Sequence, residues 1–172
     1  MKKNDSDPHA PNRFRTYREV HSTVINQFKD RGFILLDSLE FLPVGRGIWL
    51  SGRLDLRSGL VLTVEKLIAV IEGFGDDAIV QTSHYAYNLS IGGLGNVFRY
   101  DNQDDDYLRE GHLDCHHKHV FNWVTGLELG ASPQWVGRNE WPTLGQVIAE
   151  AEDWYWLHHV ELANLNPPSL EL

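Results

Sequence analysis

The sequence predicts an α+β fold in which an antiparallel β-meander of four to five strands packs against an N-terminal and a long C-terminal helix. Three observations lead to this prediction. Apolar residues recur every three or four positions near both ends, apolar and polar residues alternate in between, and the segments that join the alternating runs are short. Short connections leave no room for crossover helices, so neighbouring strands should be antiparallel. Helices and strands that are separated along the chain are typical of α+β folds.

The N-terminal helix is predicted over residues 16–31. Thr16 and Glu19 have the spacing of a capping box, the apolar positions that follow recur at helical spacing, and Gly32 ends the pattern. Residues 1–15 are polar and contain two prolines, so we expect a disordered arm before the helix.

Four strands are predicted, and the clearest evidence is the stretch GIWLSGRLDLRSG. Its leucines and isoleucine alternate with polar residues, and Ser58-Gly59 supplies a turn into the next alternating run, LVLTVEKL. A glycine-rich turn separates the last two strands. The predicted strands are residues 48–56, 60–67, 79–89 and 96–100.

The C-terminal helix is predicted over residues 143–164. Thr143 and Gln146 have capping-box spacing, a stripe of apolar residues follows, and Pro167-Pro168 ends it. If both helices cover one face of the sheet, the polar residues of the other face are left as the natural working surface.

Composition indicates one domain, over residues 16–166, in a cytoplasmic protein. The 172 residues are 42% hydrophobic, which is enough for a single core. No apolar run is long enough to cross a membrane, and the N-terminal residues lack the apolar stretch of a signal peptide, so we expect no membrane contact. The single cysteine, Cys115, fits a reducing compartment. A net charge of -9 disfavours general coating of nucleic acid and favours a local basic site, a small-molecule site or a basic partner.

The stretch GHLDCHHKHV, residues 111–120, holds four of the nine histidines. Histidine titrates near neutral pH and also ligates transition metals, so such a cluster is a candidate for chemistry. On a strand, His112, Asp114 and His116 would point to one face, and His117 and His119 would point to the other.

Acid and base catalysis is the first chemical interpretation of this stretch. Cleavage of RNA by its own 2′-hydroxyl requires a base, an acid and a cation that stabilises the developing charge. His117 and His119 would be the acid and the base, His116 lies beside them in the candidate catalytic set, and Lys118 and Arg99 would hold the phosphate. This interpretation needs no cofactor.

A metal site is the second interpretation. In a tight turn His112, Asp114, His117 and His119 could converge on Zn²⁺, whose bonds to imidazole and carboxylate are about 2.0–2.2 Å long. The spacing matches neither the H-E-x-x-H motif nor a zinc finger. A third interpretation gives the histidines a structural role, in which they cap loops and satisfy backbone groups, and the sequence leaves all three open.

The stretches SHYAYNLSI and NVFRYDN supply candidate substrate-binding residues: Tyr85, Tyr87, Arg99 and Asp101. The glycine-rich turn between the two strands should bring Tyr85 or Tyr87 close to Arg99. A guanidinium among aromatic residues usually has an anionic partner, which here is Asp101 or a bound anion. Alternating aromatic residues are also typical of the core face of a sheet.

The order LDLRSGLVLTVEKL, YAYNL, FRYDN, HHKHV and a helix opened by Pro-Thr-Leu resembles the TumE family, the toxin components of prokaryotic toxin–antitoxin pairs. The resemblance covers residues 47–152 and implies a toxin-like role with an antitoxin partner. The chain departs from the family where Cys115 replaces a more usual proline and Asn88 a more usual histidine. Its N-terminal helix, the acidic loop after FRYDN and residues 126–141 are also unlike the family.

Three functions follow as hypotheses. The first is a toxin-like ribonuclease of a prokaryotic toxin–antitoxin or defence system, which uses clustered histidines without a metal and acts on RNA. The second is a non-catalytic module that binds a protein, either as an antitoxin-type partner or through contact with a basic partner. The third is a metal-dependent nuclease or hydrolase with Zn²⁺ in the histidine cluster. The sequence predicts no oligomeric state.

Overall fold

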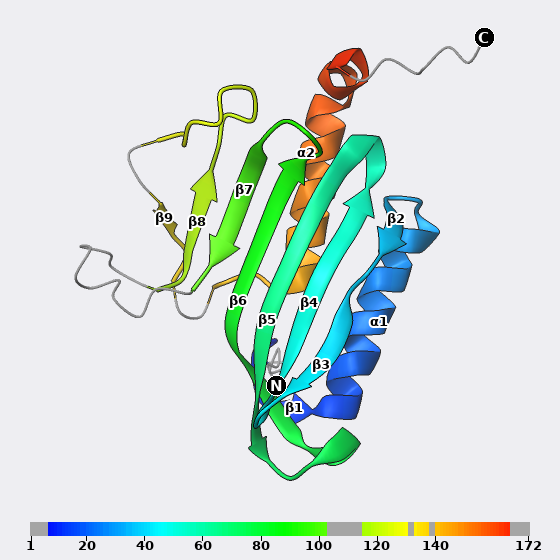
Figure 1. The fold of residues 1–172 in the computed structure, drawn as a ribbon, viewed down its shortest axis with the longest axis vertical. Coiled ribbons are helices and arrows are strands. Elements are labelled where there is room, and N and C mark those ends of the chain that lie inside the picture. Colours follow the sequence, from blue (N-terminus) through cyan, green and yellow to red (C-terminus); the bar gives the residue numbers. More distant parts are fainter. Residues whose placement is uncertain (1–6, 103–114, 131–132, 138–139, 166–172) are drawn as a thin grey trace, which may run out of the picture.

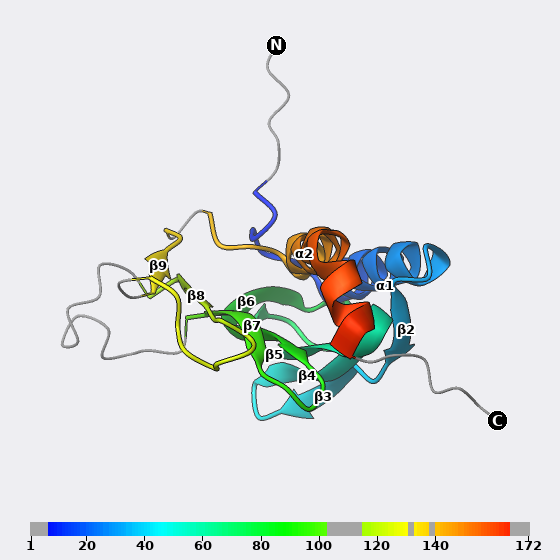
Figure 2. The same cartoon turned by 90° about the horizontal axis from the view of Figure 1, so that it is seen from above.

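The computed structural model describes residues 7–102, 115–130, 133–137 and 140–165, and it has the predicted α+β architecture. One antiparallel sheet has the strand order β2-β4-β5-β6-β7-β8-β9, with β1 beside β6 and β3 beside β4 (Figure 1). Both helices, α1 (Phe14–Asp30) and α2 (Leu144–Leu165), lie on the same face of this sheet (Figure 2). Neither is long and apolar enough to cross a membrane. The strands are β1 (Asn12–Arg13), β2 (Ile34–Asp37), β3 (Glu40–Val44), β4 (Gly47–Leu56), β5 (Leu60–Glu72), β6 (Ile79–Ile91), β7 (Asn96–Asp101), β8 (His117–Val120) and β9 (Gln134–Trp135).

The four predicted strands are confirmed as β4, β5, β6 and β7, which form the middle of the sheet. Leu54 lies opposite Leu62 in the β4–β5 pair, and the tight turn at Ser58-Gly59 has a positive φ at both residues. Within the described residues, five further strands extend the predicted meander. They have two to five residues each, too few for a clear period of two.

Helix α1 begins two residues before the predicted start, at Phe14. Its N-cap residue is Arg13, whose side chain makes no cap hydrogen bond, so the predicted capping box at Thr16 is wrong. Strand β1 fixes the start instead, because Asn12 and Arg13 pair with β6 immediately before the helix. This pairing lies in the stretch for which the sequence predicts a disordered arm.

Helix α2 begins as predicted. The Gln146 backbone N–H donates to the Thr143 hydroxyl at 3.3 Å, and the Thr143 backbone N–H donates to Oε1 of Gln146 at 2.8 Å. This reciprocal pair is a capping box, and it satisfies two backbone donors that the first turn would otherwise leave unpaired.

The core lies between the sheet and the two helices. Alternate residues of β4, β5 and β6 point toward the helices, which is the reason for the period of two in their sequences. Its fully buried large side chains are Phe33, Leu50, Leu54, Leu56, Leu60, Leu62, Ile68, Tyr85, Tyr87, Leu89, Ile91 and Ile148.

The register between β6 and β7 shifts by one residue close to their turn. Ser90 lies opposite Asn96, but Leu89 lies opposite Phe98, so the strands continue with Asn88 opposite Arg99. An unshifted ladder would have placed Tyr87 opposite Arg99. Because side chains alternate between faces, this shift decides which residues of β7 face the helices.

Candidate functional site

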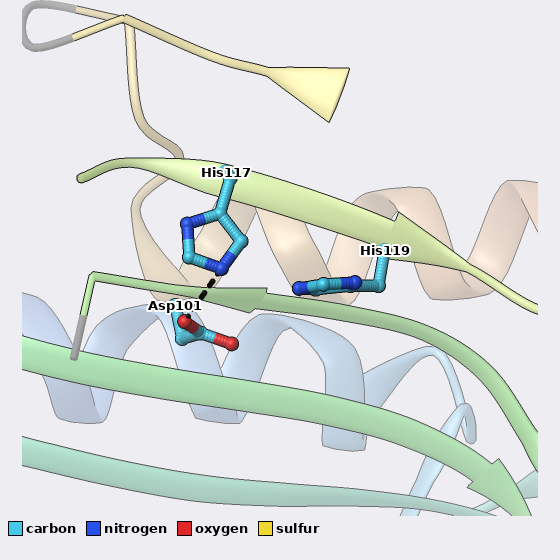
Figure 3. Close-up of side chains that lie close together, drawn as sticks. All are labelled: Asp101, His117 and His119. Carbon is cyan, nitrogen blue, oxygen red and sulfur yellow. Dashed lines mark ion pairs between the residues drawn. The ribbon is translucent and has the colours of Figure 1, made fainter. Parts of the chain in front are cut away.

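Asp101, His117 and His119 form a compact group on the sheet face opposite the helices. Asp101 is the last residue of β7 and lies opposite His117 of β8, while His119 projects from the same face of β8 two residues later. Figure 3 shows both imidazole rings beside the Asp101 carboxylate, with His117 paired to it. The ring centroids of the two histidines are 4.9 Å apart. The prediction that His117 and His119 share one face is confirmed.

Asp101 is buried and has two cationic neighbours. Its Oδ1 accepts a hydrogen bond from Nε2 of His117 at 3.0 Å, and its Oδ2 accepts one from Nε of Arg99 at 2.6 Å. Burial alone would raise the pKa of Asp101, but the hydrogen bond from His117 and the charge of Arg99 outweigh it and hold the pKa below its usual value. The carboxylate is therefore ionised at neutral pH.

His117 is held at both ring nitrogens. Its Nδ1 donates to the backbone carbonyl of Cys115 at 3.0 Å, and its Nε2 donates to Asp101. The hydrogen bond to Asp101 raises the pKa of His117 above its usual value, against the opposing effect of burial. Two acceptors at the two nitrogens favour the doubly protonated imidazolium.

His119 differs from His117 because only one of its nitrogens has a partner. Its Nδ1 donates to Oε1 of Glu128 at 2.7 Å, whereas Nε2 is buried and has no hydrogen-bond partner among the described residues. A carboxylate that accepts from Nδ1 fixes the tautomer in which Nε2 carries the lone pair. His119 therefore presents a basic nitrogen to the group.

Glu128 is a member of the site that the sequence does not predict. It lies in the loop after β8, where an isolated bridge with Phe121 turns the chain back along the sheet. A hydrogen bond from Leu129 to the Val120 carbonyl holds the same turn. The loop shows no periodic pattern, and its only sequence signal is the turn-forming Thr125-Gly126.

Arg99 borders the group on its solvent side. It lies opposite His119 in the β7–β8 pair, and 44% of its side chain is exposed. Its Nε donates a hydrogen bond to Asp101, and the two terminal nitrogens of the guanidinium are further donors. Asp101 is thus the anionic partner that the sequence offered as one of two alternatives for Arg99.

The prediction that Tyr85 or Tyr87 lies beside Arg99 is wrong. Both tyrosines are fully buried on the helix-facing side of β6, whereas Arg99 points to the other face. The one-residue register shift places Asn88 opposite Arg99 instead. Tyr85 and Tyr87 are therefore core residues, and we do not include them among the residues that contact a substrate.

Two members of the predicted catalytic set lie outside the group. His116 is buried beside Tyr85 and Trp141, with 3.1 Å between its Nδ1 and the Tyr85 hydroxyl. Lys118 faces α2, where it pairs with Glu150. Alternation along the strand separates these two residues from His117 and His119.

The predicted zinc ligands His112 and Asp114 lie outside the described residues. Among the residues that the structure describes, a different set of potential ligands comes together. One ligand atom each of Asp101, His117 and His119 lies within 4.8 Å of the others. The sequence predicts Asp101 only as a substrate-binding residue, because no local pattern places the end of FRYDN beside HHKH.

Fold and site together define an α+β protein with a buried Asp–His–His group on the face of its sheet opposite the helices. Comparison with family models, with curated proteins and with solved structures gives no match for this chain. The functional argument therefore depends on the site itself.

Proposed function

We propose that this protein is a toxin-like ribonuclease of a prokaryotic toxin–antitoxin or defence system, and that it cleaves RNA at the Asp101–His117–His119 group. One observation carries the proposal: His119 donates from Nδ1 to Glu128 and has no partner on Nε2 within the described part of the chain, and the ring of His117, which Asp101 favours in the protonated form, lies 4.9 Å away, centroid to centroid. A basic and an acidic imidazole at this separation suit a concerted proton transfer. The resemblance to the TumE family supports the toxin-like role in this proposal.

In this mechanism Nε2 of His119 takes the proton from a 2′-hydroxyl. The freed oxygen attacks the adjacent phosphorus, and the bond between phosphorus and the 5′-oxygen breaks. The proton that His117 shares with Asp101 passes to the departing 5′-oxygen, so the products are a 2′,3′-cyclic phosphate and a 5′-hydroxyl. His119 ends protonated and His117 deprotonated, and exchange with water restores both.

Arg99 supplies the positive charge for the phosphate. A guanidinium has five N–H donors in a plane that matches phosphate oxygens, and Asp101 occupies only one of them. Arg99 and Glu128, whose side chain is 36% accessible, are the exposed residues that border the buried group. A local cation is needed because the net charge of -9 repels RNA elsewhere.

Expression in bacteria tests this function. Wild type should slow growth and degrade RNA, whereas His117→Ala combined with His119→Ala should do neither. His159→Ala is the matched control, because His159 is an exposed histidine on α2. Equal toxicity of the double variant and wild type would reject the catalytic assignment.

A protein-binding module is the second candidate function, and exposed apolar residues on α2 favour it. Trp156 is 53% accessible and Leu157 is 81% accessible, and the acidic charge would steer a basic partner to the molecule. An antitoxin is the partner that the TumE resemblance implies. A purified protein that is inert on RNA, and whose complex with the product of the adjacent gene is lost in Trp156→Ser with Leu157→Ser, would support this candidate.

A further inference from the structure

We infer that Asp101, His117 and His119 form a binding site for a zinc ion, with Oδ1 of Asp101 and Nε2 of both histidines as ligands. This set differs from the four residues that the sequence suggested, because it draws Asp101 from β7 and depends on no residue of the acidic loop. Two imidazoles and one carboxylate are a donor set that divalent first-row metals accept, and zinc favours it.

The separations of the ligand atoms suit a single ion. Bonds of about 2.0–2.1 Å place neighbouring ligands about 3.3 Å apart in a tetrahedral zinc site. Nε2 of His117 and Oδ1 of Asp101 are 3.0 Å apart, and the three ligand atoms lie within 4.8 Å of one another. The backbone of β8 directs His119 to the same face of the sheet as His117.

Each ligand also has an outer partner on the atom that faces away from the ion. The backbone carbonyl of Cys115 accepts a hydrogen bond from Nδ1 of His117, and Oε1 of Glu128 accepts one from Nδ1 of His119. Nε of Arg99 donates a hydrogen bond to Oδ2 of Asp101. Metal-binding histidines nearly always donate their second nitrogen to a carbonyl or a carboxylate in this way. These contacts fix the orientation of all three ligands before an ion arrives.

A second, independent observation is that Nε2 of His119 has no hydrogen-bond partner among the residues that the structure describes. A buried ring nitrogen without a partner loses its hydration without compensation. A bound ion would supply that partner. Binding of the ion displaces the Nε2 proton of His117, and the two carboxylates of Asp101 and Glu128 then outweigh the positive charge of Arg99.

For RNA cleavage, zinc would act as an inhibitor. This consequence rests on the proposed function, because the lone pair that would take the 2′-hydroxyl proton is the one that would bind the ion. Binding of the ion itself does not depend on that function.

Titration of the purified metal-free chain with Co²⁺ and Zn²⁺ tests the site. We expect a visible absorption band of bound Co²⁺ at one equivalent, loss of the band when Zn²⁺ is added, and no heat of binding with Mg²⁺. Asp101→Asn and His119→Gln should each weaken zinc binding by at least about 100-fold, and Glu128→Gln by about 10- to 100-fold through the outer contact. His159→Ala should bind like wild type.

The wild-type spectrum decides the proposal even if a variant unfolds. A chain whose Co²⁺ spectrum equals that of free Co²⁺ would overturn it. So would loss of binding in His112→Ala with normal binding in a folded Asp101→Asn. If the protein binds zinc but does not cleave RNA, the zinc site stands and the proposed ribonuclease function is rejected. If the protein cleaves RNA at an unchanged rate at zinc concentrations above the Kd, the inhibitory role of zinc is rejected.

Discussion

Glu128 accepts a 2.7 Å hydrogen bond from Nδ1 of His119 and thereby leaves the lone pair of this histidine on Nε2. We expect Glu128→Gln to lower the rate of RNA cleavage by about 10-fold, because an amide can accept from Nδ1 or donate to it and no longer fixes one tautomer. The ¹⁵N chemical shifts of His119 should show a mixture of tautomers in the variant. A variant with full activity and an unchanged tautomer would remove Glu128 from the site.

Lys118 should contribute to stability and not to catalysis. It pairs with Glu150, which also accepts a 2.8 Å hydrogen bond from the Tyr100 hydroxyl, on the face of the sheet that α2 covers. We expect Lys118→Met to lower the free energy of unfolding by about 1 kcal/mol, measured in urea, with normal cleavage of RNA. The matched control is Lys29→Met, which removes the pair of a more exposed lysine with Asp37 and should cost less than about 0.5 kcal/mol.

A loss of cleavage in folded Lys118→Met would contradict this placement. Such a result would support the prediction from the sequence that Lys118 binds the phosphate.

His21 should make the fold sensitive to acid. Burial, followed by the charge of Lys66, lowers the pKa of His21 to about 4. Between the unfolded value of about 6.5 and this folded value, the unfolded chain binds a proton that the folded chain does not, so the free energy of unfolding decreases as the pH falls. The contribution lost over this range is on the order of 2–3 kcal/mol.

Urea unfolding of wild type and His21→Gln between pH 7.5 and 4 measures this effect. The stability of wild type should fall more steeply than that of the variant between pH 6.5 and 4. Parallel curves would show that His21 does not titrate in this way.

Gly52 should be intolerant of a side chain. A Cβ atom there would lie 2.3 Å from the Ser38 carbonyl oxygen, and the φ of +144° is one that other residues rarely adopt. We expect Gly52→Ala to lower the free energy of unfolding by about 3 kcal/mol or more. Gly59→Ala is the control, since its φ is also positive but nothing lies within 4 Å, and it should cost only about 1–2 kcal/mol. Equal midpoints of urea unfolding for the two variants would contradict the steric explanation.

The central strands and the second helix were predictable because their signals are local. Alternation in GIWLSGRLDL follows directly from the burial of one face of β4, and the Thr143–Gln146 capping box uses residues three positions apart. Strand β3 carries Pro43 and lies at an edge, where it pairs with half of β4, so its own sequence contains little information.

The candidate site was only partly predictable because its members meet through register. Strand alternation was enough to place His117 and His119 together. The position of Arg99 depended on a one-residue shift near Ser90, which no local pattern in the turn indicates. Glu128 reaches His119 across an irregular loop, and such contacts follow from tertiary structure alone.

The packing of His9 against Trp141 links the two ends of the domain. Their rings stack with centroids 3.5 Å apart, and Nε2 of His9 lies 2.8 Å from the Trp141 carbonyl oxygen, across 132 positions of sequence. During synthesis, His9 must therefore wait until Trp141 has left the ribosome before this contact can form. Because closing a loop of this length costs entropy before the contact rewards it, the stacking of His9 on Trp141 should be among the last contacts to form as the domain folds.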